Sequence, residues 1–101
     1  MVTLHDGFAV CILPSDATLD LRSLGKHVSM APIERAERVT GYVAGGISPL
    51  GQRRALPTYL DDSALQFDAI YVSAGRRGLE MQLAPSDLVS LTNATVQRLC
   101  R

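Results

Sequence analysis

The sequence predicts a single mixed α/β (α+β) domain with a largely antiparallel mixed sheet and short flanking helices. Apolar runs of strand length recur along the chain, short segments with helix-capping residues separate them, and residues 69–84 carry a clear hairpin pattern. The 101 residues are 47% hydrophobic, which is enough for one core. We therefore expect residues 1–101 to form one domain.

The first half of the chain is expected to alternate strands with short helices. The turn His5-Asp6-Gly7 is a hairpin signal, Gly25 is a typical helix end, and Pro32 suits the first position of a helix. These signals give strands at 2–4 and 8–13, a helix at 19–24, a strand at 28–31 and a helix at 32–38.

The second half is expected to hold a strand at 56–60, a hairpin and a final helix. Strands at 70–74 and 79–83 flank the turn Gly75-Arg76-Arg77-Gly78, which pairs Ser73 with Glu80. Alternation puts two sets of side chains on opposite faces. The apolar set is Ile70, Val72, Leu79, Met81 and Leu83, and the polar set is Tyr71, Ser73, Glu80 and Gln82. The last helix starts after Pro85 and is expected to continue or restart through Val96 and Leu99.

The charge balance limits the function classes that fit this sequence. Ten basic and ten acidic residues leave no net charge, which argues against a protein that grips long stretches of nucleic acid. Brief contact with an RNA end through a local basic patch stays open. The two cysteines and two histidines form no zinc pattern. No signal peptide and no membrane-spanning apolar run are found, so a cytoplasmic location is expected.

Residues 40–51 form a loop that contains four of the eight glycines of the chain. Glycine lets another molecule approach the backbone closely, and the N–H groups of such a loop could face a carbonyl or a phosphate. A tight structural crossover is the alternative, and the glycines alone favour it. The loop is neither a Walker A loop nor a dinucleotide fingerprint.

Several strings together resemble the YbaK/EbsC family of aminoacyl-tRNA deacylases, over essentially the whole chain. They are Thr40-Gly41-Tyr42, the GGISPLG string at 45–51, Asp61, the YVSAGRRGL string at 71–79 and Pro85-Ser86-Asp87-Leu88. The resemblance implies a free-standing editing domain related to the insertion domain of bacterial prolyl-tRNA synthetases. Such a domain hydrolyses mischarged aminoacyl-tRNA, in YbaK itself Cys-tRNA(Pro), and needs no cofactor. The implied partners are the 3′ end of an aminoacyl-tRNA and a prolyl-tRNA synthetase.

The resemblance also implies roles for particular residues. The Gly-x-x-x-Pro loop of the family falls on Gly45 to Pro49, and its backbone N–H groups would stabilise the oxyanion of the cleaved ester. A pocket serine falls on Ser73, and a pocket aspartate falls on Glu80. The expected catalytic set is Gly45, Gly46 and Ile47, and the expected substrate-binding set is Thr40, Gly41, Ser48, Pro49, Ser73, Gly75 and Glu80.

Two basic pairs are candidates for contact with the tRNA: Arg53 with Arg54, and Arg76 with Arg77. The family carries a Lys-Thr dipeptide before the first strand of this sequence, and Met1 stands directly after that place. Lys26 is the only lysine. We therefore expect a truncated family member, with a homodimer as one way to cover an exposed sheet edge. A non-catalytic module that binds an amino acid, a tRNA end or a protein is the alternative function.

Overall fold

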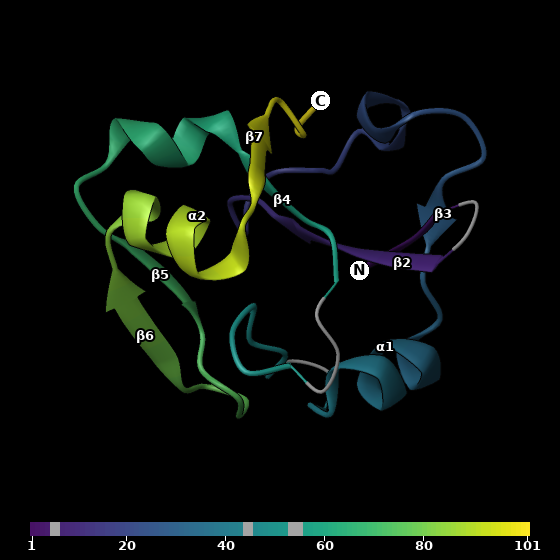
Figure 1. Ribbon diagram of the computed structural model, residues 1–101, viewed down its shortest axis with the longest axis horizontal. Coiled ribbons are helices and arrows are strands. Elements are labelled where there is room, and N and C mark those ends of the chain that lie inside the picture. Colours follow the sequence, from purple (N-terminus) through teal and green to yellow (C-terminus); the bar gives the residue numbers. More distant parts are fainter. Residues whose placement is uncertain (5–6, 44–45, 53–55) are drawn as a thin grey trace.

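The fold consists of a five-stranded mixed sheet and a separate two-stranded hairpin (Figure 1). The computed structural model describes residues 1–4, 7–43, 46–52 and 56–101. In sheet order the five strands are β3 (Ser29–Met30), β1 (Val2–Leu4), β2 (Gly7–Ile12), β4 (Thr58–Asp61) and β7 (Thr95–Gln97). β1 pairs antiparallel with β2 and β3, whereas β4 runs parallel to β2 and β7. The predicted mixed α/β class is confirmed.

The helices within the described residues are short, and two of them are 3-10 helices. They are η1 (Leu21–Leu24), α1 (Ile33–Thr40), η2 (Asp62–Gln66) and α2 (Pro85–Thr92). The helix predicted at 19–24 is η1, which Asp20 caps by accepting a hydrogen bond from the amide of Arg22 at 3.1 Å. It ends at Gly25, whose φ of +118° suits glycine. The middle of the predicted turn before β2, at His5 and Asp6, lies outside the described residues.

The hairpin has the predicted register. β5 (Ile70–Ser73) and β6 (Glu80–Leu83) pair antiparallel, with Ser73 opposite Glu80 and Val72 opposite Met81. The amide of Ala74 donates to the carbonyl of Leu79 at 2.9 Å and closes the turn. Leu79 itself precedes β6 and is 48% exposed, so it does not belong to the core face as expected. The other four apolar residues of that face contribute to the core.

The end of the chain differs from the prediction. The helix does not continue after α2 but gives way to β7, which runs parallel to β4 with Leu60 beside Val96. Asn93 adopts the left-handed conformation at φ 55° and ψ 39° and ends the helix. The residues after it, Thr95 and Val96, are β-branched and therefore favour a strand. Asn93 as a helix end and this β-branched pair are the features of the sequence that could have predicted strand β7.

The core joins the five-stranded sheet to the hairpin through α2. Leu60 of β4, Val72 of β5 and Leu88 of α2 are buried in one cluster. Figure 1 shows α2 beside the β5–β6 hairpin, with α1 at the opposite end of the molecule. The helices in the part of the chain that the structure describes lack the length and the continuous apolar surface of a membrane span.

Asp61 fastens the C-terminal segment to the end of β4. Its carboxylate is 3% exposed, and one oxygen accepts hydrogen bonds from the amides of Leu99 at 2.7 Å and Cys100 at 3.2 Å. The other oxygen accepts from the hydroxyl and the amide of Ser63 in η2. Burial raises the pKa of Asp61, but these hydrogen bonds outweigh it and hold the pKa at about 2.

Replacing Leu60 with Ala should destabilise the domain strongly. The side chain is 1% exposed at the centre of the cluster, so its loss leaves a cavity and should lower the free energy of unfolding by about 2–5 kcal/mol. Leu65→Ala is the matched control, because Leu65 is 56% exposed and should lose less than about 1 kcal/mol. Urea unfolding of the three proteins measures both values. Equal losses would contradict the assignment of Leu60 to the core.

The contribution of Asp61 to stability should depend on pH. A folded pKa of about 2 lies below the ordinary 3.8, so the contribution is complete above about pH 5 and disappears as the pH falls toward 2. This shift corresponds to about 2.5 kcal/mol. The difference in unfolding free energy between the natural protein and Asp61→Asn should therefore narrow over this range. A difference that stays constant from pH 6 to pH 2.5 would contradict the ionised, hydrogen-bonded carboxylate.

Candidate functional site

The loop over residues 46–52 lies against the turn of the β5–β6 hairpin, and Gly46 makes the closest approach. A Cβ atom at Gly46 would lie 2.7 Å from the carbonyl carbon of Arg76 and 2.8 Å from the amide nitrogen of Arg77. No side chain fits there, because both neighbours are backbone atoms. The absence of a side chain at Gly46 thus allows the loop to contact the hairpin turn. The sequence instead predicts that the glycines of this loop leave room for a ligand.

Tyr42 contacts the same two segments from the side of α1. Its hydroxyl donates a hydrogen bond to the carbonyl of Leu50 at 2.7 Å. Its ring lies 3.1 Å from the position that a Cβ atom of Gly75 would take, and its hydroxyl lies 2.9 Å from the same position on Gly51. Tyr42 belongs to one of the strings that carry the family resemblance, and no separate role is predicted for it from the sequence.

Thr40 and Gly41, expected among the substrate-binding residues, shape the end of α1. Thr40 is 1% exposed, and its hydroxyl donates to the carbonyl of Ala36 at 2.8 Å and accepts from the amide of Tyr42 at 3.2 Å. Gly41 ends the helix in the left-handed conformation at φ 83°. In this structure the Thr40 hydroxyl is therefore bonded to the backbone, and the two residues direct Tyr42.

Several polar groups of the described loop form hydrogen bonds within the loop. The amide of Gly46 donates to the carbonyl of Val43 at 3.0 Å, so it points into the loop and not toward a ligand as expected. Ser48 is 1% exposed, and its hydroxyl accepts from the amide of Leu50 at 3.2 Å. The hydroxyl of Ser48 is therefore turned inward. Gly45, another expected catalytic residue, lies outside the described residues, and Ile47 is half-buried beside Gly46.

The hairpin presents the other expected residues. Ser73 is half-buried and Glu80 is exposed, and they are direct cross-strand neighbours on the face away from α2. Gly75 follows at φ 101°, and Arg76 and Arg77 are exposed at the turn. The structure thus brings one of the two basic pairs to the junction with the loop. The other pair, residues 53–54, lies outside the described residues.

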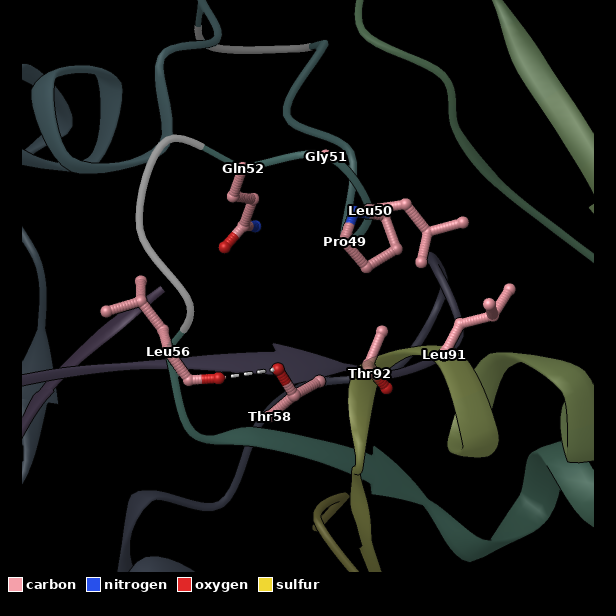
Figure 2. A pocket seen from close by; sticks show the side chains of 8 residues that line it. All are labelled: Pro49, Leu50, Gly51, Gln52, Leu56, Thr58, Leu91 and Thr92. Atoms are coloured by element: carbon pink, nitrogen blue, oxygen red, sulfur yellow. Dashed lines mark hydrogen bonds between the residues drawn. The ribbon is translucent and has the colours of Figure 1, made fainter.

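A pocket of about 210 Å³ opens on the other side of the loop, between the loop, the start of β4 and the end of α2 (Figure 2). Pro49, an expected substrate-binding residue, lines it. Gln52 extends into the space and donates to the carbonyl of Ser48 at 2.9 Å. The remaining lining residues are Leu50, Gly51, Leu56, Thr58, Leu91 and Thr92.

Comparison with known proteins supplies the decisive observation. The sequence profile of the aminoacyl-tRNA editing domain matches residues 1–91. The chain belongs to the aminoacyl-tRNA editing domain family. It is also 44% identical over 92 residues to EbsC of Enterococcus faecalis, an inferred Cys-tRNA(Pro)/Cys-tRNA(Cys) deacylase, which confirms the YbaK/EbsC resemblance. That match covers 86% of this chain and 56% of EbsC, so the chain spans little more than half of that relative.

Solved structures carry the same fold as this editing domain. A crystal structure of an inferred trans-editing enzyme for prolyl-tRNA synthetase superposes with a TM-score of 0.92 at 27% identity. The match covers 99% of the editing domain and 66% of that protein. The hypothetical protein APE2540 gives a TM-score of 0.88 at 25% identity, with 99% and 70% covered. The fold predicted from the resemblance is thus confirmed along nearly the whole chain.

The described parts of the editing domain offer carboxylate, hydroxyl, guanidinium and backbone groups, but no metal centre. No cluster of three or more His, Cys, Asp or Glu side chains in those parts could hold a metal ion. The groups at the junction can form hydrogen bonds and stabilise charge, since the turn carries two guanidinium groups and Glu80 carries one carboxylate.

Substituting Gly46 with Ala should open the junction of the editing domain. The added methyl group collides with the backbone of Arg76 and Arg77, so the loop and the turn must separate, at an expected cost of about 1–3 kcal/mol in unfolding free energy. Gly7→Ala is the matched control, because a Cβ atom there meets nothing within 4 Å. Urea unfolding measures both. Equal stability of the two variants would contradict the close approach.

Proposed function

We propose that this editing domain hydrolyses mischarged aminoacyl-tRNA, with Cys-tRNA(Pro) as its main substrate. The observation that carries the proposal is the contact of the loop at Gly46 with the turn at Arg76–Arg77, because it joins the Gly-x-x-x-Pro segment to the strand that bears Ser73. The name of EbsC supports the choice of amino acid and tRNA. The substrate would meet residues from both segments at this junction, in the single domain proposed for residues 1–101.

The proposed reaction is assisted by the substrate. The thiolate of the cysteinyl group attacks its own ester carbonyl, so a carbon–sulfur bond forms. The ester carbon–oxygen bond then breaks, and the leaving ribose oxygen takes up, through water, the proton that the thiol had released. The product is a cyclic thiolactone of cysteine, which a water molecule then opens to free cysteine. The protein needs to orient the ester and stabilise the negative charge on the carbonyl oxygen. Because the Gly46 amide already bonds to Val43, the amides of Gly45 and Ile47 are the proposed donors within the loop.

The hairpin is proposed to hold the rest of the substrate. Ser73 would donate a hydrogen bond to the aminoacyl group, and Glu80 would accept from its α-ammonium group or from a ribose hydroxyl. Arg76 and Arg77 are exposed at the turn and would contact phosphates at the 3′ end of the tRNA. A prolyl-tRNA synthetase that delivers the tRNA is the proposed protein partner.

A non-catalytic binding module is the second candidate, and the position of the single lysine favours it. Lys26 is exposed next to Gly25 at the end of η1, where it lines a shallow surface with Arg22 and His27, none of which belongs to the junction. The ammonium group of Lys26 therefore does not reach the proposed site. A module of this kind would bind the 3′ end of an aminoacyl-tRNA without shortening the lifetime of the ester.

Deacylation of Cys-tRNA(Pro) by this chain should exceed the spontaneous rate, and the hairpin should control it. We expect Ser73→Ala to lower kcat/KM about tenfold, and Glu80→Gln to lower it about 10- to 100-fold through loss of a charged hydrogen bond. Gln82→Ala is the control on the same face of β6, with an expected change below twofold. Release of labelled cysteine is the measurement.

The same assay separates the two candidate functions. Hydrolysis at the spontaneous rate, together with retention of the tRNA on the protein in a filter-binding assay, would establish the binding module. If the chain neither hydrolyses the ester nor retains the tRNA, both candidate functions are ruled out.

A further inference from the structure

The side chain of Tyr42 touches both halves of the proposed site and belongs to neither. Its hydroxyl hydrogen-bonds the carbonyl of Leu50 in the loop, and its ring packs against Gly75 in the hairpin turn. Leu50 directly follows Pro49, and Gly75 is two residues after Ser73. One side chain therefore contacts both the loop that would stabilise the oxyanion and the turn next to the strand that would hold the aminoacyl group.

The segment before Tyr42 holds this side chain in place. The amide of Tyr42 donates to the Thr40 hydroxyl, which is itself bonded to the carbonyl of Ala36 one turn earlier in α1. Gly41 ends α1 in the left-handed conformation. The ring of Tyr42 therefore follows directly from a helix end whose backbone and Thr40 side chain are held by hydrogen bonds.

The two positions next to the Tyr42 ring, Gly51 and Gly75, both require glycine. Gly51 has φ +66°, and a Cβ atom there would lie 2.9 Å from the Tyr42 hydroxyl. Gly75 has φ +101°, and a Cβ atom there would lie 3.1 Å from the ring. An L-residue at either position would be strained by the backbone and would also press on Tyr42. The packing around Tyr42 thus depends on glycine on both sides.

We propose that Tyr42 is a positioning residue that aligns the Gly46–Gly51 loop with the hairpin turn. The proposal rests on the proposed deacylase function for its kinetic consequences only. Its structural content is that the hydroxyl restrains the loop and the ring restrains the turn. The two contacts can be removed one at a time.

Tyr42→Phe removes the hydrogen bond to Leu50 and keeps the ring. We expect the amides at Leu50–Gln52 to exchange with solvent about tenfold faster, while those of Ala74 and Leu79 in the hairpin stay unchanged. In the deacylation assay kcat should fall about tenfold with KM within twofold, because alignment of the ester is lost and contact with the tRNA is not. Tyr42→Leu also removes the ring, so in addition to the effect of Tyr42→Phe it should make the amide of Ala74 exchange with solvent faster. Tyr59→Phe, on β4, is the control for removing a tyrosine hydroxyl and should change neither measurement.

Each outcome decides a different claim. Unchanged exchange at Leu50–Gln52 in Tyr42→Phe would overturn the proposal, whatever the kinetics. Faster exchange with an unchanged kcat would show a purely structural contact and also overturn it. If the natural protein hydrolyses no aminoacyl-tRNA, the deacylase function fails. Retention of Cys-tRNA(Pro) on a filter then replaces kcat as the readout, and equal retention by Tyr42→Phe would overturn the positioning role.

Discussion

The contact between the Gly46 loop and the backbone of Arg76–Arg77 is the constraint on which the candidate site depends. Strands β5 and β6 form no ladder with the five-stranded sheet within the described residues, so backbone hydrogen bonds between strands do not fix the hairpin. The apolar cluster of Leu60, Val72 and Leu88 holds one face of the hairpin, and the loop holds its turn. Apolar packing, which is non-directional, holds the hairpin against α2 and β4. The backbone contact at Gly46 and the hydrogen bond of Tyr42 fix where the hairpin turn lies along the loop.

The features predicted correctly are local in sequence. The register of Ser73 opposite Glu80 follows from a four-residue turn and strict alternation, and both can be read within 14 residues. The final strand β7 was missed because its apolar residues fit a helix as well as a strand until Asn93 is recognised as a stop. Its pairing with β4 joins residues 36 apart, for example Tyr59 with Thr95, and periodicity carries no information about such pairing.

The residues of the candidate site could be predicted from the sequence only in part. The resemblance selected residues by position, but it could not tell which hydroxyl groups face a ligand. Thr40 and Ser48 are each 1% exposed and bonded to nearby backbone, which is an equally common use of Ser and Thr near a helix end or a turn. Ser73 and Glu80 lie on a strand, where alternation alone decides the face, and the predicted face is the one observed.

The position of β7 in the chain has a consequence for the newly synthesised protein. β4 is a central strand of the finished sheet, with β2 on one side and β7 on the other. The ribosome completes β2 before β4, and it reaches β7 only after the β5–β6 hairpin and α2 have been made. Until β7 emerges, one edge of β4 is therefore unpaired and able to pair with another nascent chain. The carboxylate of Asp61 likewise receives the amides of Leu99 and Cys100 only once that segment is available, so the same stretch of chain both closes the edge of β4 and satisfies the carboxylate at its end.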